Sequence, residues 1–242
     1  MQNELGTPEY TQSMVVLTGA GISAESGVPT YRGTEGLWRN HCPQDLATPG
    51  AFSRDPDLVW DFYKWRRELV TSCEPNLAHL TLVEMEKQFE NFFIITQNVD
   101  GLHQRAGSKN VLELHGSLWK IKCTQCGDRW QDFQIPLPAG NPICPSCGSL
   151  ARPDVVWFGE PLERDILEQA HALSASADWM LVVGTSASIQ PANILPLIAR
   201  EVGARIIEIN LEPTPLSAEA SLTLKGPAGE VLPSWWDRIR HG

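Results

Sequence analysis

The chain has 242 residues, of which 42% are hydrophobic, and its formal net charge is −10. A chain of this composition can bury a substantial core, and the acidic balance disfavours nucleic acid as the main partner, because phosphate binding needs a basic patch. No window approaches the roughly eighteen consecutive apolar residues of a membrane span, and the first residues lack the pattern of a secretory signal. We therefore expect a cytoplasmic globular protein whose thiols stay reduced.

Apolar runs and helical patterns alternate along the chain. Nearly continuous apolar runs, typical of strands covered on both faces, lie at residues 15–18, 92–96, 111–114, 179–184 and 204–210. Helical patterns lie at about 55–72, 76–88, 162–175, 191–202 and 229–240. This order predicts an α/β fold, a Rossmann-like parallel sheet with helices on both faces.

The helix expected over 55–72 has two apolar stripes. The stripe predicted to face the core contains Leu58, Phe62, Trp65 and Leu69. The neighbouring stripe contains Val59, Tyr63, Arg66 and Val70. It places a phenol and a guanidinium side by side at i, i+3. Such a pair serves packing, forms a salt bridge with Asp61 or another acid, or recognises a charged ligand.

The strand at 15–18 runs into a glycine-rich loop. Gly19, Gly21 and Ala24 satisfy the dinucleotide-binding pattern G-x-G-x-x-G/A. Such a loop lets backbone amides approach a pyrophosphate, although a glycine turn after a buried strand often serves packing alone. The acidic residue expected about twenty positions later is missing. Asn210 and Glu212, at the end of a later strand, could bond ribose hydroxyls instead.

Polar side chains follow two further strands. Gln97, Asn98 and Asp100 come after the strand at 92–96, at the strand end where ligands bind in open α/β sheets. His115 follows the strand at 111–114 and should open into the same crevice. A near-neutral base there could remove a proton from a sugar hydroxyl. The other histidines are expected to be structural.

Four cysteines form two C-x2-C pairs separated by seventeen residues. They are Cys123, Cys126, Cys144 and Cys147. This spacing is typical of a zinc site with four thiolates, which leaves no open coordination position and is therefore structural. Two disulfides or unrelated thiols are the alternatives. The Cys-, Pro- and Gly-rich segment around these pairs predicts a small zinc-ribbon module inserted into the larger domain. Cys42 and Cys73 are expected to be structural.

These motifs resemble those of the sirtuins, the NAD-dependent protein lysine deacylases. GAGISAESGVPTYRG, TQNVDGLH, LELHGS, the cysteine pairs, VVWFGE, VVGTS and INLE follow one another in that family's order, from about residue 14 to 232. The resemblance implies that NAD is consumed as a co-substrate, that acylated proteins bind as extended peptides, and that one zinc ion is structural. The chain is similar to a prokaryotic member of the family, and we expect it to be a monomer.

The resemblance also implies one catalytic domain with three parts. The Rossmann-like part comprises residues 1–32, 90–118 and 153–242. The helical segment of a small lobe comprises 33–89, and the zinc-binding module comprises 119–152.

By resemblance, NAD is bound by a set of residues at the strand ends. The set is Gly19, Ala20, Gly21, Ser23, Glu25, Arg32, Trp38, Gln97, Asn98, Val99, Asp100, Gly184, Thr185, Ser186, Asn210, Leu211, Glu212 and Ala228. The catalytic residues would be Asn98 and His115. In the family's mechanism the acyl oxygen attacks C1′ of the nicotinamide ribose, and His115 would deprotonate the ribose so that its 2′-oxygen attacks the acyl carbon. The products are free lysine, nicotinamide and 2′-O-acyl-ADP-ribose.

The resemblance further assigns the protein substrate. VVWFGE at 155–160 looks like a strand to which the peptide adds by main-chain bonding, with Val156, Phe158 and Gly159 beside the lysine tunnel. Tyr31 stands where the family usually has phenylalanine, at a position that shields the departing nicotinamide.

The stripe with the phenol and the guanidinium resembles one branch of the family in particular. Tyr63 and Arg66 match the class III pair at the floor of the acyl pocket, and Ala47 matches a small residue that widens it. That branch removes succinyl and malonyl groups as well as acetyl. An acidic acyl chain in an apolar tunnel needs its carboxylate paired, and a planar guanidinium does this better than an ammonium group.

Overall fold

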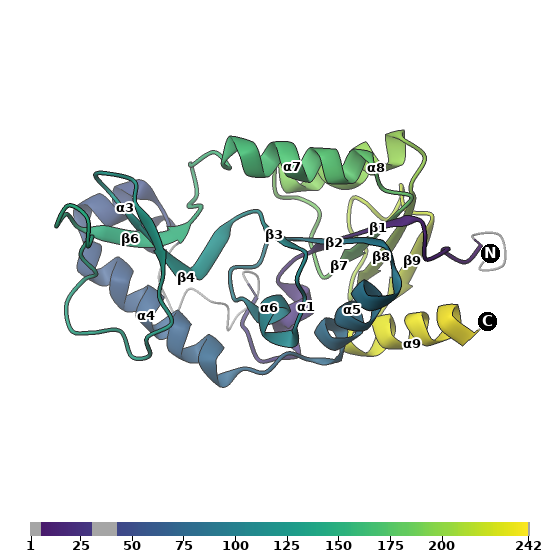
Figure 1. Ribbon diagram of the computed structural model, residues 1–242, viewed down its shortest axis with the longest axis horizontal. Coiled ribbons are helices and arrows are strands. Elements are labelled where there is room, and N and C mark those ends of the chain that lie inside the picture. Colours follow the sequence, from purple (N-terminus) through teal and green to yellow (C-terminus); the bar gives the residue numbers. More distant parts are fainter. Residues whose placement is uncertain (1–5, 31–42, 242) are drawn as a thin grey trace.

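The computed structural model describes residues 6–30 and 43–241. Tyr31, Arg32, Trp38 and Cys42 lie outside the described residues. The described chain forms a larger part around a six-stranded sheet and a smaller lobe around a three-stranded sheet, side by side along the long axis (Figure 1). No helix in the described ranges is long and apolar enough to cross a membrane.

The larger sheet is parallel throughout. Its strands, in spatial order, are β3 (Val111–Glu113), β2 (Asn91–Thr96), β1 (Ser13–Thr18), β7 (Trp179–Val183), β8 (Arg205–Asn210) and β9 (Leu222–Lys225). This is the strand order of the Rossmann fold, and it reverses between β1 and β7, where the strand ends open a ligand-binding crevice. The sequence predicted five of these strands. It missed β9, a short edge strand whose residues alternate between partly buried and exposed.

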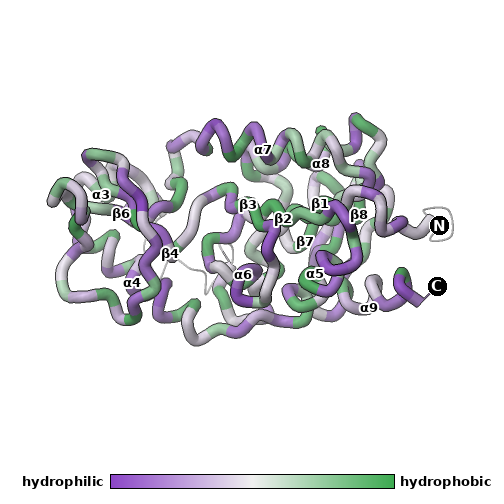
Figure 2. Tube along the Cα trace, in the orientation of Figure 1, coloured by the Kyte–Doolittle hydropathy of each residue, from purple (hydrophilic) through white to green (hydrophobic). Residues whose placement is uncertain are grey.

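Helices cover both faces of this sheet. On one face lie α7 (Arg164–Ala175) and α8 (Leu195–Glu201), and on the other lie α5 (Leu77–Gln88) and α9 (Ala228–His241) (Figure 1). Along β1, Met14 and Val16 join the core under α5 and α9, whereas Val15 and Leu17 join the core under α7 and α8. In Figure 2 the tube of α7 changes between purple and green along its length, as expected for a helix with one side on a sheet. The predicted α/β fold is confirmed.

Short elements connect the strand ends. The helix predicted at 191–202 consists of a 3₁₀ turn (Ala192–Ile194) followed by α8. After β1 the chain forms only α1 (Gly21–Ala24), and α6 (Leu102–Ala106) follows the loop after β2.

The smaller lobe combines a three-stranded antiparallel sheet with three helices. The sheet has the order β5 (Arg129–Gln131), β4 (Gly116–Cys123) and β6 (Ala151–Val155). The helices are α2 (Pro43–Leu46), α3 (Pro49–Arg54) and α4 (Pro56–Ser72). Asp55 caps α4 by accepting a hydrogen bond from the Leu58 amide, and Trp60 on α4 donates its indole N–H to the Ala151 carbonyl at 2.9 Å.

Both stripes of α4 pack in the core of the smaller lobe, and the second stripe is the more deeply buried one. The exposed fraction is 7% or less for all of Val59, Tyr63, Arg66 and Val70. Of the stripe that was predicted to face the core, only Phe62 is fully buried, and Leu58, Trp65 and Leu69 are partly buried. The reason is that the Tyr63 side of α4 faces the segment after β6, which covers it. A helical period identifies apolar stripes but does not say which of two adjacent stripes is covered.

Candidate functional site

The glycine loop lies against the end of β7 at the topological switch point. The Gly19 amide donates to the Val183 carbonyl at 3.0 Å, and the Gly21 amide donates to the Gly184 carbonyl at 2.8 Å. A side chain at Gly184 would place its Cβ 2.4 Å from the Ile22 nitrogen, and the φ of +63° at Gly184 also disfavours other residues. These glycines therefore serve the close approach of two strand ends.

One amide of this loop remains for a ligand. The amides of Gly19, Gly21, Ile22 and Ser23 all donate within the protein. The Ala20 amide, at the start of α1, donates to no residue in the described part of the chain. A backbone N–H at the switch point suits an anionic group such as a pyrophosphate. The loop could thus hold a dinucleotide, with the Ala20 amide available as a donor.

Buried hydrogen bonds fix the loop after β2. The Ser23 hydroxyl donates to Asp100 Oδ2 at 2.8 Å and accepts from Asn98 Nδ2 at 3.1 Å, and the Leu102 amide donates to Asp100 Oδ1. Burial raises the pKa of Asp100, and the bonds from Leu102 and Ser23 oppose that rise. Ser23, Asn98 and Asp100 are each at most 6% exposed. The structure therefore brings these predicted site residues together, with their polar atoms directed at one another.

His115 has the geometry of a general base. Its Nδ1 lies 2.9 Å from the Gln97 carbonyl oxygen, which can only accept, so Nδ1 carries the proton and Nε2 carries the lone pair. Burial lowers the pKa of His115, with the bond to Gln97 as a smaller opposing cause. Burial therefore favours the neutral form of the imidazole. The predicted grouping of His115 with the loop after β2 agrees with this contact.

Three strand ends are tied together on the other side of the switch point. Gln97 Nε2 donates to the Thr185 hydroxyl at 2.9 Å, and Asn210 Nδ2 donates to the Thr185 carbonyl at 2.7 Å. Thr185 thus links the ends of β2, β7 and β8. Glu212 is exposed and pairs with Lys225 at 3.2 Å.

Three more predicted residues lie at or near these strand ends. Ser186 shares a hydrogen bond with Ser188, and Leu211, the next residue after Asn210, is 54% exposed. Val99, in the loop after β2, is buried and packs in the core of the smaller lobe.

Glu25 connects the glycine loop to a distant helix. Its carboxylate accepts a hydrogen bond from the Gly229 amide at 2.7 Å, next to Ala228 at the first residue of α9. A carboxylate at a helix N-terminus is favoured by the helix dipole. Glu25 is therefore bonded to the residue that follows Ala228, and this contact holds α9 against the loop.

The phenol and guanidinium of α4 are both inside the smaller lobe. Tyr63 is 2% exposed, and its oxygen accepts a hydrogen bond from the Trp157 indole N–H at 2.9 Å. Arg66 is 7% exposed, and its guanidinium lies 5.6 Å from the Tyr63 ring centroid and 5.7 Å from that of Phe62. Within the described ranges, Arg66 forms no hydrogen bond and no ion pair through its side chain. The alternative of a salt bridge between Arg66 and Asp61 is not realised, because Asp61 pairs with Lys64 instead, at 3.5 Å.

The segment expected to be a strand at 155–160 is mostly a turn. β6 ends at Val155, and Gly159 adopts a φ of +86°. The Val156 amide donates to the His115 carbonyl, and the Phe158 amide donates to the Ala47 carbonyl at 3.0 Å. The prediction of a strand over the whole segment was wrong, because the Val156 bond extends the pairing with β4 by only one residue and the chain then turns at Phe158 and Gly159. The two bonds place the segment between His115 and Ala47.

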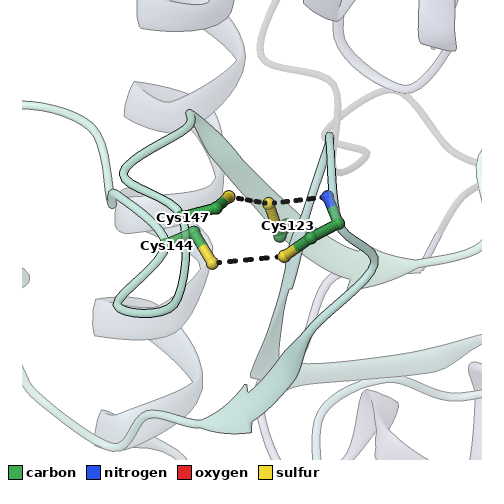
Figure 3. Close-up of side chains that lie close together, drawn as sticks. Cys123, Cys144 and Cys147 are labelled. Carbon is green, nitrogen blue, oxygen red and sulfur yellow. Dashed lines mark hydrogen bonds between the residues drawn. The ribbon is translucent and has the colours of Figure 1, made fainter.

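Four sulfur atoms converge at one end of the smaller sheet. The ligand atoms of Cys123, Cys126, Cys144 and Cys147 all lie within 4.8 Å of one another. The closest contacts are 3.5 Å between Cys123 and Cys147 and 3.7 Å between Cys126 and Cys144, and Figure 3 shows the labelled sulfurs pointing toward each other. Zn–S bonds of about 2.3 Å in a tetrahedron separate sulfurs by about 3.8 Å. The cysteines are thus positioned to bind a structural zinc ion, and the disulfide alternative is wrong because all four are free.

Comparison with known proteins agrees with this geometry. Residues 19–191 match the Sir2 family. The chain belongs to the Sir2 family. Its relatives include the NAD-dependent protein deacylase of Aquifex aeolicus (strain VF5), which is 51% identical over 229 residues, or 95% of this chain and 96% of the relative.

Solved Sir2 structures superpose on the whole chain. A Sir2 homologue–NAD complex has a TM-score of 0.92 at 47% identity and covers 99% of this chain and 94% of its own. A complex described as Sir2–p53 peptide–NAD+ has a TM-score of 0.83 at 35% identity, and the match covers 95% of this chain and 94% of the chain in the complex. The protein is therefore an NAD-dependent protein deacylase of this family.

The site of this Sir2 protein also contains polar residues that were not predicted from the sequence. The Thr18 and Thr96 hydroxyls, which end β1 and β2, lie 2.8 Å apart, and Thr96 accepts from the Asn98 amide. The sequence did contain a signal for Thr18 and Thr96, because each is a polar residue at the end of an apolar run. His103 was expected to be structural, and its Nε2 lies 3.0 Å from the Thr18 hydroxyl. Trp157, which bonds to Tyr63, sits between two residues that were predicted for the peptide site.

Proposed function

We propose that the protein removes acyl groups from lysine side chains of proteins with consumption of NAD, and that it favours acyl groups ending in a carboxylate, such as succinyl and malonyl. The products would be free lysine, nicotinamide and 2′-O-acyl-ADP-ribose. Acetyl-lysine would be a substrate as well. The membership of the Sir2 family supports the reaction, and the environment of Arg66 supports the acyl preference.

The buried guanidinium of Arg66 is the observation that carries the acyl preference. A buried charge without hydrogen-bond acceptors is costly, because neither the faces of Phe62 and Tyr63 nor the coulombic attraction to Asp100 replaces the hydrogen bonds of water. The carboxylate of a succinyl or malonyl group would supply the missing charge-assisted hydrogen bonds. Ala47 is 5% exposed in the same core and leaves room for a longer acyl chain.

The strand-end residues would hold NAD and move the proton. NAD supplies a ribose carbon from which nicotinamide can leave. Ala20 would donate to the pyrophosphate, Thr185 and Asn210 would lie beside the adenosine half, and the Gln97–Asp100 loop would hold the nicotinamide ribose. His115, neutral and with its Nε2 lone pair directed away from Gln97, would accept a proton from a ribose hydroxyl. Arg32 and Trp38 complete the proposed NAD set outside the described residues.

The peptide substrate would lie along the turn at 156–159. The solved structure described as Sir2–p53 peptide–NAD+ supports a peptide as the bound substrate, and its extended form is part of this proposal. Val156 and Gly159 would line the entrance, and Phe158, which is 51% exposed, would contact the substrate chain. A reducing compartment such as the cytoplasm would preserve the zinc thiolates, and we expect a monomer.

The test compares succinyl-lysine and acetyl-lysine peptides of the same sequence, with peptide mass and released nicotinamide measured together. Arg66→Met should lower kcat/KM for the succinyl peptide about 100-fold, because a buried bond between charged groups contributes about 3 kcal/mol. The acetyl peptide has no carboxylate, so its kcat/KM should change about threefold at most.

Lys64→Met is the matched control, since it removes a partly exposed cation from the same helix that pairs with Asp61 at 3.5 Å. It should leave the ratio of the two substrates as it is in the wild type. Equal losses on both peptides in Arg66→Met would refute the acyl preference. Nicotinamide release that is just as fast without any peptide would refute the deacylase reaction itself.

A further inference from the structure

Trp157 connects the segment proposed to bind the peptide (156–159) to the proposed acyl pocket at Tyr63 and Arg66. It lies in the turn after β6, between Val156 and Phe158, and is 3% exposed. Its indole N–H donates to the Tyr63 phenol oxygen at 2.9 Å. An indole nitrogen only donates, so the direction of this bond is fixed and Tyr63 is the acceptor.

This bond determines what the Tyr63 hydroxyl can do. The indole occupies an acceptor position of the phenol oxygen, so the phenol proton must point away from Trp157. A hydroxyl that accepts one hydrogen bond is polarised and becomes a stronger donor in the next. Tyr63 and Arg66 are on the same side of α4, and the guanidinium carbon is 5.6 Å from the phenol ring centroid. The bond from Trp157 therefore prepares the phenol to donate to an anion beside Arg66.

Trp157 is itself held from two directions. The Arg152 guanidinium carbon lies 3.4 Å from the centroid of the indole, and Arg152 forms two hydrogen bonds with Glu160, at 2.6 and 2.9 Å. Glu160 in turn accepts a hydrogen bond from the Trp157 amide at 2.9 Å. The Phe52 ring packs 5.3 Å from the indole. The indole plane and its main chain are thus both fixed, which a residue present only to fill space would not require.

We propose that Trp157 is a specificity-determining positioning residue, which orients the Tyr63 hydroxyl toward the carboxylate of an acidic acyl group. The proposal rests on the acyl preference proposed above. It adds a residue outside α4 to those that determine the acyl preference, because Trp157 belongs to the segment that would contact the peptide.

The experiment is a double-mutant cycle with Trp157→Phe and Tyr63→Phe, using succinyl and acetyl peptides. Trp157→Phe keeps an aromatic ring but removes the N–H. It should raise KM for the succinyl peptide about tenfold and change kcat little, and the KM for the acetyl peptide should rise much less. In the Tyr63→Phe background, Trp157→Phe should add little, because there is no phenol left to orient.

Two results would overturn the proposal. One is an equal rise of KM for both peptides in Trp157→Phe, and the other is independent, multiplying effects of the two substitutions. Either would mean that Trp157 only packs. If Trp157→Phe does not fold, as judged by its thermal unfolding, 3-benzothienylalanine at position 157 keeps the indole shape without the N–H and is subject to the same criteria.

Arg66→Met, measured in parallel, separates this proposal from the acyl preference. If Arg66→Met is selective for the succinyl peptide and the variants at position 157 are not, only the role of Trp157 is wrong. If Arg66→Met is not selective, the proposed acyl preference itself is wrong.

Discussion

Replacing Arg67 with methionine should loosen the attachment of the zinc-binding module (residues 119–152) to α4. Arg67 is 1% exposed and donates to Asp132 Oδ1 at 2.7 Å and to the Asp132 and Gln134 carbonyls. Its guanidinium also lies 5.2 Å from the Trp119 ring centroid. The indole of Trp119 donates to the Asp100 carbonyl at 2.7 Å. Arg67 therefore connects α4 to the zinc-binding module and to Trp119, the residue that bonds to the loop after β2.

The expected cost follows from these contacts. The bond between Arg67 and the Asp132 carboxylate joins two charged groups and contributes about 2 kcal/mol, and the bonds to carbonyls contribute about 1 kcal/mol together, because water can reach the exposed Gln134. The sum of about 3 kcal/mol corresponds to a decrease in Tm of about 6–12 °C for a chain of this length. The guanidinium Nε and Nη1 have no hydrogen-bond partner, so no further bonds are lost there.

Thermal unfolding followed by tryptophan fluorescence measures this cost. The double variant Arg67→Met/Asp132→Leu should recover much of the lost stability, because replacing both members of a buried ion pair by apolar groups is often neutral. A decrease in Tm below about 2 °C for Arg67→Met would refute the reasoning, as would a double variant that is less stable than either single one.

Two further predictions concern the base and the metal. Because burial lowers the pKa of His115 and the neutral form is the base, the acid limb of the kcat/KM profile should have its midpoint below the ordinary histidine value of 6.5. Stopped assays at pH 5–8 test this, and a midpoint above 6.5 would contradict it. Removing zinc with a chelator, or Cys126→Ser, should unfold the smaller sheet and abolish activity, as measured by released zinc and near-UV circular dichroism. A zinc-free protein with full activity would contradict the structural role.

The sequence by itself determined the parts of the fold that depend on local pattern. Continuous apolar runs predict buried parallel strands, because both faces of such a strand are covered and no polar position alternates. The same reasoning fails for β9, where only Leu222 and Leu224 are apolar and one side of the strand is open. The two cysteine pairs predicted the metal site, because the C-x2-C spacing already sets the geometry of each knuckle.

Only the tertiary structure decided which side of α4 faces inward and what its polar groups meet there. Trp157 and Tyr63 are 94 residues apart, and no pattern in either segment specifies their hydrogen bond. Whether Arg66 has a partner likewise depends on side chains from α4, the turn after β6 and the loop around Ala47. Helical period fixes which residues share a face, whereas the burial of that face and the pairing of its charges depend on elements that the chain brings together only when it folds.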